Sequence, residues 1–187
     1  MEAVLPTACA DEDAMLRVAA GDNRALAWLF DRHKTRLFGF LYHLVGDRPL
    51  AEDLLGDTFL RVYQARGRYR AGSAFVPWLY SIARNLAVGE LRRRGCLLRV
   101  HQRLTREAAD ETEEWEVDRE ELRERVRIAL LHLPEEQRTA LVLKEYAGLS
   151  YREIAQAMGG TEEGARARAY RARAAMREEL RDYCAEE

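Results

Sequence analysis

The stretch NRALAWLFDRHKTRLFGFLYHLV, residues 23–45, decides the fold class of this chain. Its apolar residues recur every three or four positions, and with one histidine they form a single broad stripe: Leu26, Leu29, Phe30, His33, Leu37, Phe40, Leu41 and Leu44. This spacing is that of one face of an α-helix. Asp22 is suited to cap the start of the helix, and Gly46-Asp47 to end it.

The same helical spacing continues on both sides of this stretch, and no segment alternates at the period of a strand. We therefore predict an all-α fold. The expected helices span residues 12–20, 23–45, about 49–65, 75–95, 118–131, 135–147, a short helix after Ser150, and about 162–184. Gly67–Ser73 is expected to be a loop. Ser150 and Glu153 form a capping-box pattern, and Thr161 is expected to cap the last helix.

Composition limits the class of protein. Of 187 residues, 33% are charged and 48% hydrophobic, which is typical of a folded globular chain. Three widely spaced cysteines, Cys9, Cys96 and Cys184, form no C-x-x-C pair, so neither disulfides nor a metal site is expected. No signal peptide and no apolar run long enough to span a membrane is present, which predicts a cytoplasmic protein without membrane insertion.

Basic residues gather between residues 66 and 103, although the net charge of the whole chain is only −2. Glu90 is the only acid among them, and the bases are Arg66, Arg68, Arg70, Arg84, Arg92, Arg93, Arg94, Arg99 and Arg103. Such a segment is suited to a phosphate backbone, and interleaved aromatics can stack on unpaired bases. Phe75 and Trp78 are themselves expected to lie in the core. For the arginines, the alternative is a solvated basic face.

After this basic segment, residues 107–116 (EAADETEEWE) are strongly acidic and are interpreted as the core of a linker between domains. Beyond it, a short helix, a Gly159-Gly160 turn and a longer basic helix give the outline of a helix-turn-helix. On the last helix a stripe of small residues is flanked by two rows of arginines. This pattern fits a helix packed on its own domain while facing a DNA groove, or a merely solvated basic helix.

Two composite motifs carry a family resemblance. The first combines AEDLLGDTFLRVY (residues 51–63), FVPWLYSIARNL (residues 75–86) and Arg92–Arg94. The second combines LPEEQRTALVL (residues 133–143), GLSYREIA (residues 148–155) and RAYRAR (residues 168–173). In this order they resemble regions 2 and 4 of the extracytoplasmic-function (ECF) sigma factors of the sigma-70 family.

The resemblance implies two small helical domains, a region 2 bundle at residues 10–95 and a region 4 helix-turn-helix at residues 117–184. A flexible acidic linker would join them at residues 96–116. Such a protein directs RNA polymerase to promoters and is not an enzyme. Its partners would be core RNA polymerase, promoter DNA and an anti-sigma factor, with no cofactor and no metal.

The resemblance also implies three sets of site residues. Those that would bind the polymerase clamp are Asp53, Asp57 and Arg61. Those that would bind the −10 element are Arg68, Tyr69, Arg70, Ser73, Arg84, Asn85, Arg92, Arg93 and Arg94. Those that would bind the −35 element are Thr161, Arg166, Arg168, Arg171 and Arg173.

Two departures from the family pattern affect these surfaces. Gly56 stands where family members usually carry a polar residue, often Gln. Gly164 and Ala165 replace hydroxyl-bearing or larger residues at the start of the last helix, which alters the expected −35 contacts.

Other classes of function remain open at this point. A helix-turn-helix regulator that binds duplex DNA alone as a dimer would explain residues 150–173 but not residues 51–86. An enzyme would need a catalytic motif, and neither a Walker loop, an HExxH motif nor a nucleophile elbow is present. A purely structural helical adaptor would bind no DNA at any salt concentration.

Overall fold

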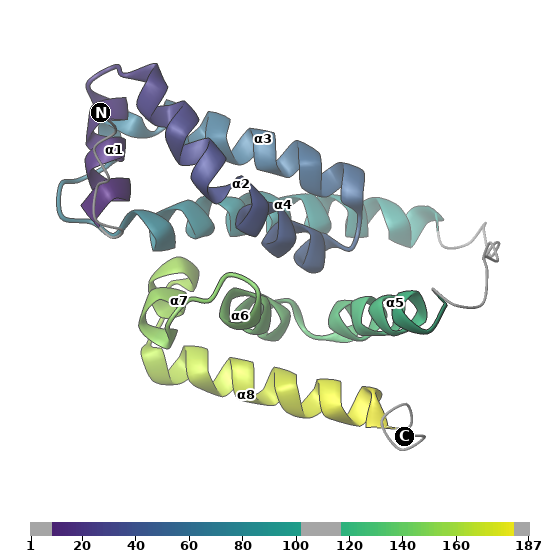
Figure 1. Cartoon of the computed structure of the whole chain (residues 1–187). Helices are drawn as coiled ribbons and strands as arrows, with labels where there is room; N and C mark the ends of the chain where they lie inside the picture. Colours follow the sequence, from purple (N-terminus) through teal and green to yellow (C-terminus); the bar gives the residue numbers. More distant parts are fainter. Residues whose placement is uncertain (1–8, 102–116, 182–187) are drawn as a thin grey trace.

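The computed structural model describes residues 9–101 and 117–181, and these residues form helices without any strand. The first half holds α1 (Cys9–Ala19), α2 (Asn23–Val45), α3 (Arg48–Gln64), a 3₁₀ turn (Arg66–Arg68) and α4 (Phe75–His101). The second half holds α5 (Val117–His132), α6 (Glu135–Glu145), α7 (Tyr151–Met158) and α8 (Glu162–Glu179). The predicted all-α fold is confirmed (Figure 1).

Side-chain caps begin several helices where the sequence predicts them. The Asp22 carboxylate accepts the backbone N–H of Arg24 at 2.9 Å and of Ala25 at 3.2 Å. At α7, Ser150 accepts the N–H of Glu153, and the Glu153 carboxylate accepts the N–H of Ser150 at 2.8 Å, which completes the capping box. These bonds satisfy backbone donors that the helix itself leaves free.

The α2 stripe forms the centre of the first half. Leu29, Leu37, Phe40, Leu41 and Leu44 are fully buried. The ring of Phe40 meets that of Tyr80 on α4 edge to face, with centroids 5.2 Å apart. In the second half, a seam of three buried alanines on α8 packs against α6 and α7: Ala165, Ala169 and Ala172. Small side chains there let the helix backbones approach closely.

Two helix ends differ from the prediction by five residues or more. The fourth helix continues through Gly95 to His101, because one glycine inside a helix costs only about 1 kcal/mol relative to alanine. Residues 96–101, expected to belong to the linker, are therefore helical. The last helix ends at Glu179, before the predicted Cys184. The acidic stretch at residues 107–116 lies outside the described residues.

The two halves pack against each other along α4. Figure 1 shows α5, α6 and α7 beside the first half, with α8 outermost, and α7 makes the most extensive contacts with α4. The contact includes polar bonds to the end of α2: Arg138 donates to the Leu44 carbonyl and Arg127 to the Gly46 carbonyl, both at 3.1 Å. The His43 ring lies 3.7 Å from that of Tyr146, and burial lowers the pKa of His43.

Within the described residues, no helix has the length and apolar character needed to cross a membrane. The described side chains also include no group of histidine, cysteine or acidic residues placed to hold a metal ion.

Gly46 provides a test of this packing. It adopts a left-handed conformation with φ of +73°, and a Cβ added there would lie 2.7 Å from Cδ1 of Leu131 on α5. Gly148 has nearly the same φ, +72°, but open space around it. Each alanine substitution should lower the free energy of unfolding by roughly 1–2 kcal/mol, because alanine disfavours the left-handed conformation. Gly46→Ala should lose up to about 1 kcal/mol more, because its Cβ displaces the end of the half-buried Leu131 side chain at the interface between the halves.

Urea denaturation of the two variants measures this difference. Size-exclusion elution should also show Gly46→Ala to be the more expanded protein. Equal losses of unfolding free energy for Gly46→Ala and Gly148→Ala would contradict the described packing.

Candidate nucleic-acid interface

One face of α3 is fully open to solvent. Asp53, Asp57 and Arg61, the predicted partner-binding residues, are all exposed. Leu60 shares this face with 55% of its surface exposed, and a Cβ on Gly56 would meet nothing within 4 Å. On a helix, positions 53, 56, 57 and 60 fall within roughly 100° of each other. The face therefore combines two carboxylates with an exposed leucine. Nothing in the sequence pattern alone indicated that Leu60 would be exposed.

The loop between α3 and α4 exposes several polar side chains above a buried tyrosine. Arg68, Arg70 and Ser73 are exposed. Tyr69 is instead buried, with its ring 5.1 Å from that of Trp78 and its phenol donating to the Ser73 carbonyl. Burial, with smaller effects from Glu12 and Asp11, raises the pKa of Tyr69 to about 12. Tyr69 thus packs beneath the loop and does not offer its ring to solvent.

Phe75 and Trp78 belong to the core, as the sequence predicted. Phe75 is fully buried, and Trp78 is partly buried and packs against the core. The two rings lie 6.2 Å apart.

The predicted arginines of α4 differ in their exposure. Arg84 is only 15% exposed and its Nη2 lies 2.9 Å from Oε1 of Glu135 on α6. Arg92 is 78% exposed and lies 3.5 Å from the other oxygen of the same carboxylate. Asn85, next to Arg84, is exposed. Glu135 therefore bridges two of these residues from the opposite half of the molecule.

Arg93 and Arg94 share one acidic partner on their own helix. Glu90 lies 2.8 Å from Arg93 and 3.0 Å from Arg94. Hydrogen bonds from these two guanidinium groups lower the pKa of Glu90 to about 2. Arg94 also reaches Asp47 at 3.3 Å. Glu90, the one acid of the basic segment, thus orients two of its arginines.

The helix-turn-helix outline is present in α7 and α8. Thr161 begins α8 by accepting the N–H of Gly164 at 3.1 Å, as predicted. Near this end Arg166 is 66% exposed, within 3.4 Å of Glu162 and over the ring of Tyr151 at 5.4 Å. Arg168 is 30% exposed and bonds Glu136 at 2.8 Å. The exposed Arg171 lies one turn further along.

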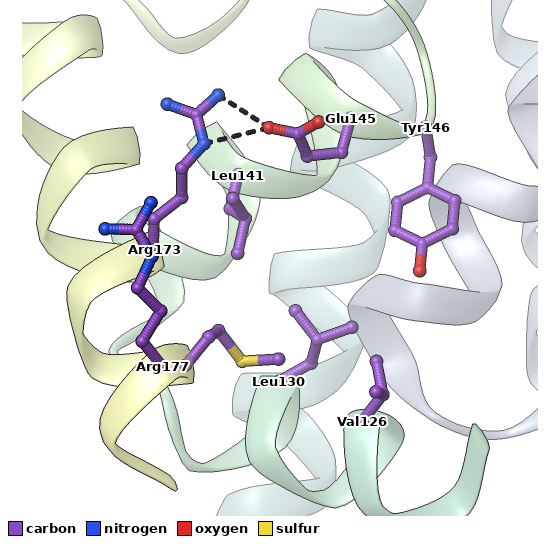
Figure 2. A pocket seen from close by; sticks show the side chains of 8 residues that line it. Val126, Leu130, Leu141, Glu145, Tyr146, Arg173 and Arg177 are labelled. Atoms are coloured by element: carbon purple, nitrogen blue, oxygen red, sulfur yellow. Dashed lines mark hydrogen bonds and ion pairs between the residues drawn. The ribbon is translucent and has the colours of Figure 1, made fainter. Parts of the chain in front are cut away.

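Arg173 lies where α8 meets α6 and α7. Its Nε donates to Glu145 at 2.9 Å and its Nη1 to the Tyr151 hydroxyl at 3.2 Å. Figure 2 shows Arg173 and Arg177 along one edge of an open apolar groove of about 340 Å³. The groove is lined on its other sides by Val126, Leu130, Leu141, Glu145, Tyr146 and Met176. Arg173 is thus held in place by two partners, unlike the more exposed Arg166.

Comparisons with known proteins match one segment in each half of the chain. Residues 29–96 match the family model described as sigma-70 region 2, and residues 123–176 match sigma-70 region 4. The RNA polymerase sigma factor CarQ of Myxococcus xanthus is 38% identical, over 89% of this chain and 95% of CarQ. The RNA polymerase sigma-H factor of Pseudomonas aeruginosa is 34% identical, over 89% of this chain and 91% of that protein.

A solved structure also shares the fold. CnrH, in its complex with the cytosolic domain of CnrY, superposes with a TM-score of 0.72 and 25% identity. The match covers 92% of this chain and 98% of CnrH.

Proposed function

The chain belongs to the sigma-70 family, in its ECF group, and we propose that the surfaces described above let it guide RNA polymerase to promoters. The observation that carries this function is the pair of family matches, to region 2 and to region 4, in the family's order. Sigma factors initiate transcription by binding the −10 and −35 elements together with the polymerase. We further infer that the chain catalyses no reaction of its own and acts in the cytoplasm.

Run-off transcription with core polymerase over a genomic promoter pool tests this function. Specific transcripts that depend on the added protein are expected. A helix-turn-helix regulator acting alone would instead bind duplex promoter DNA tightly without polymerase and produce no transcripts.

The functional division of the chain follows the same scheme. Residues 10–95 would contact core polymerase and the −10 element, residues 117–184 the −35 element, and residues 96–116 would connect them. The helical extension of α4 to His101 stiffens the start of this connection. Since the solved relative CnrH is bound by CnrY, we also propose an anti-sigma factor as a partner.

Core polymerase would bind the open face of α3. Asp53 and Asp57 offer two carboxylates one helical turn apart, Arg61 offers a cation, and Leu60 offers apolar surface. An exposed leucine bordered by charges is suited to an interface with an apolar centre and a polar rim.

Charge reversal on this face should weaken binding to the polymerase. The double variant Asp53→Lys/Asp57→Lys should bind core polymerase less tightly in a pull-down titration. Its thermal melt should change little, since exposed charges contribute about 0–1 kcal/mol each.

The matched control is Asp13→Lys/Asp31→Lys, which reverses two exposed acids on α1 and α2. It changes the net charge equally and should leave polymerase affinity unchanged. Equal affinity for both double variants would remove α3 from the polymerase interface.

The −10 element would be bound by the loop after α3 and by α4. The exposed Arg68, Arg70 and Ser73 of the loop would meet the separated strand, with Tyr69 supporting them from below. Further along α4, Asn85 and the arginines Arg84, Arg92, Arg93 and Arg94 would follow the phosphate backbone.

Salt dependence measures the contribution of Arg92, Arg93 and Arg94. Replacing all three by alanine should reduce the salt slope of holoenzyme–promoter binding by up to about one unit per lost phosphate contact. The control replaces three exposed bases of α2 and α3: Arg24, Lys34 and Arg48. A slope equal to that of the wild type would mean that Arg92–Arg94 face solvent in the complex.

The −35 element would be bound by α8. The N-terminal part of such a helix reaches base edges, and arginine most often binds guanine there. Thr161 would fix the start of the helix, Arg166 and Arg168 would contact bases, and Arg171 and Arg173 would contact phosphates. The two bonds that hold Arg173 to Glu145 and Tyr151 support an anchoring role.

A randomised −35 library, transcribed by each variant holoenzyme and sequenced, separates these roles. Arg166→Ala or Arg168→Ala should relax the preference at one or two positions, by roughly 1–3 kcal/mol of discrimination. Arg173→Ala should weaken use of all sequences about equally. If all three variants shift the preference alike, or none does, the division of α8 into base-contacting and phosphate-contacting residues is wrong.

A further inference from the structure

The start of α4 lacks a cap of its own. Phe75 is the first helical residue, and Ala74 before it has no side-chain acceptor. Alanine is among the poorest residues at this position. The Phe75 N–H donates instead to Oε1 of Glu12 at 2.9 Å, although Glu12 lies 63 residues earlier in the chain. Glu12 on α1 thus supplies from a distance the cap that the local sequence omits.

The partial burial of the Glu12 carboxylate supports this role. Its second carboxylate oxygen, Oε2, is buried and has no hydrogen-bond partner among the described residues. Burying part of a carboxylate costs free energy. The positive end of the α4 dipole offsets some of this cost, since the helix begins directly at the carboxylate. A carboxylate that were only a surface charge would stay in water.

The neighbouring acid fixes α1 independently of the loop. Asp11 is 7% exposed and lies 2.9 Å from Nε of Arg32 and 3.1 Å from Nε2 of His33, both on α2. These contacts hold α1 on the bundle. Glu12, the next residue, is therefore presented to α4 from a fixed support.

The segment that Glu12 holds is the exposed loop before α4. Arg70, Ala71, Gly72, Ser73 and Ala74 are all exposed. Its beginning is fixed by buried Tyr69, which packs on Trp78 and bonds the Ser73 carbonyl. Its end is fixed by the bond from Phe75 to Glu12. Two fixed ends reduce the number of conformations open to the exposed residues between them.

We propose that Glu12 is a positioning residue for promoter opening, which holds the loop at residues 70–74 in the shape that receives the unpaired −10 strand. This inference rests on the proposed function of the loop. Glu12 does not touch the DNA in this scheme; it acts through the first turn of α4. α1 is thus a working part of the −10 interface, although it precedes the residues matched to region 2.

Hydrogen exchange on the free protein tests the cap itself. Glu12→Ala should speed amide exchange at Phe75 and in the loop, whereas Asp13→Ala, at the adjacent exposed acid, should leave it unchanged. Glu12→Gln, which keeps an acceptor oxygen, should slow exchange again. Unchanged exchange in Glu12→Ala would overturn the capping role.

Open-complex formation by the holoenzyme tests the consequence, on a promoter selected in run-off transcription with the wild type. Glu12→Ala should lower the open-complex constant roughly fivefold, which corresponds to the ~1 kcal/mol of a lost N-cap. Core polymerase affinity should stay the same. Glu12→Gln should recover most of the loss.

The possible outcomes separate this inference from the function it rests on. Wild-type activity in Glu12→Ala, or a loss that Glu12→Gln does not recover, would overturn the positioning role. A wild-type holoenzyme that opens no promoter would count against the proposed function, while the exchange experiment would still decide whether Glu12 caps α4.

Discussion

The carboxylate of Glu135, in the first turn of α6, holds Arg84 and Arg92 of α4 at 2.9 and 3.5 Å. A partly buried ion pair of this kind adds little to the free energy of unfolding. Removing one partner would nevertheless leave the charge of the other partner poorly solvated. Together with the bonds from Arg127 and Arg138 to the end of α2, it fixes which part of α4 faces the second half. Apolar contact alone would allow the two halves to slide, whereas these directional bonds specify one arrangement.

The same pairing explains how a chain with a net charge of −2 is suited to DNA. Several of the arginines assigned to promoter binding have a carboxylate partner within the chain: Arg84 with Glu135, Arg93 with Glu90, Arg168 with Glu136 and Arg173 with Glu145. A phosphate that binds such an arginine replaces a carboxylate. The guanidinium is already ordered by that carboxylate, so less ordering entropy is lost on binding.

The features predicted from the sequence are those set by neighbouring residues. Helical spacing, the caps at Asp22, Ser150 and Thr161, and the alanine seam of α8 all act within a few positions of the chain. The bond from Phe75 to Glu12 and the pair of Arg84 with Glu135 join residues 63 and 51 positions apart. No local pattern indicates such contacts, because they depend on how the helices pack. The helix end predicted at Gly95 was wrong for a different reason. A glycine inside a helix costs only about 1 kcal/mol relative to alanine, which the other residues of this long helix outweigh.

The burial of Tyr69 depends on packing that the sequence pattern does not indicate. Aromatics among arginines predict stacking on bases, but one ring cannot both fill the space against Trp78 and Phe75 and receive a base. The buried phenol donates to the Ser73 carbonyl within the loop, which leaves Arg68, Arg70 and Ser73 as the exposed groups there. The buried ring of Tyr69 is thus not placed to stack on a base, whereas the planar guanidinium groups of exposed arginines can lie against one.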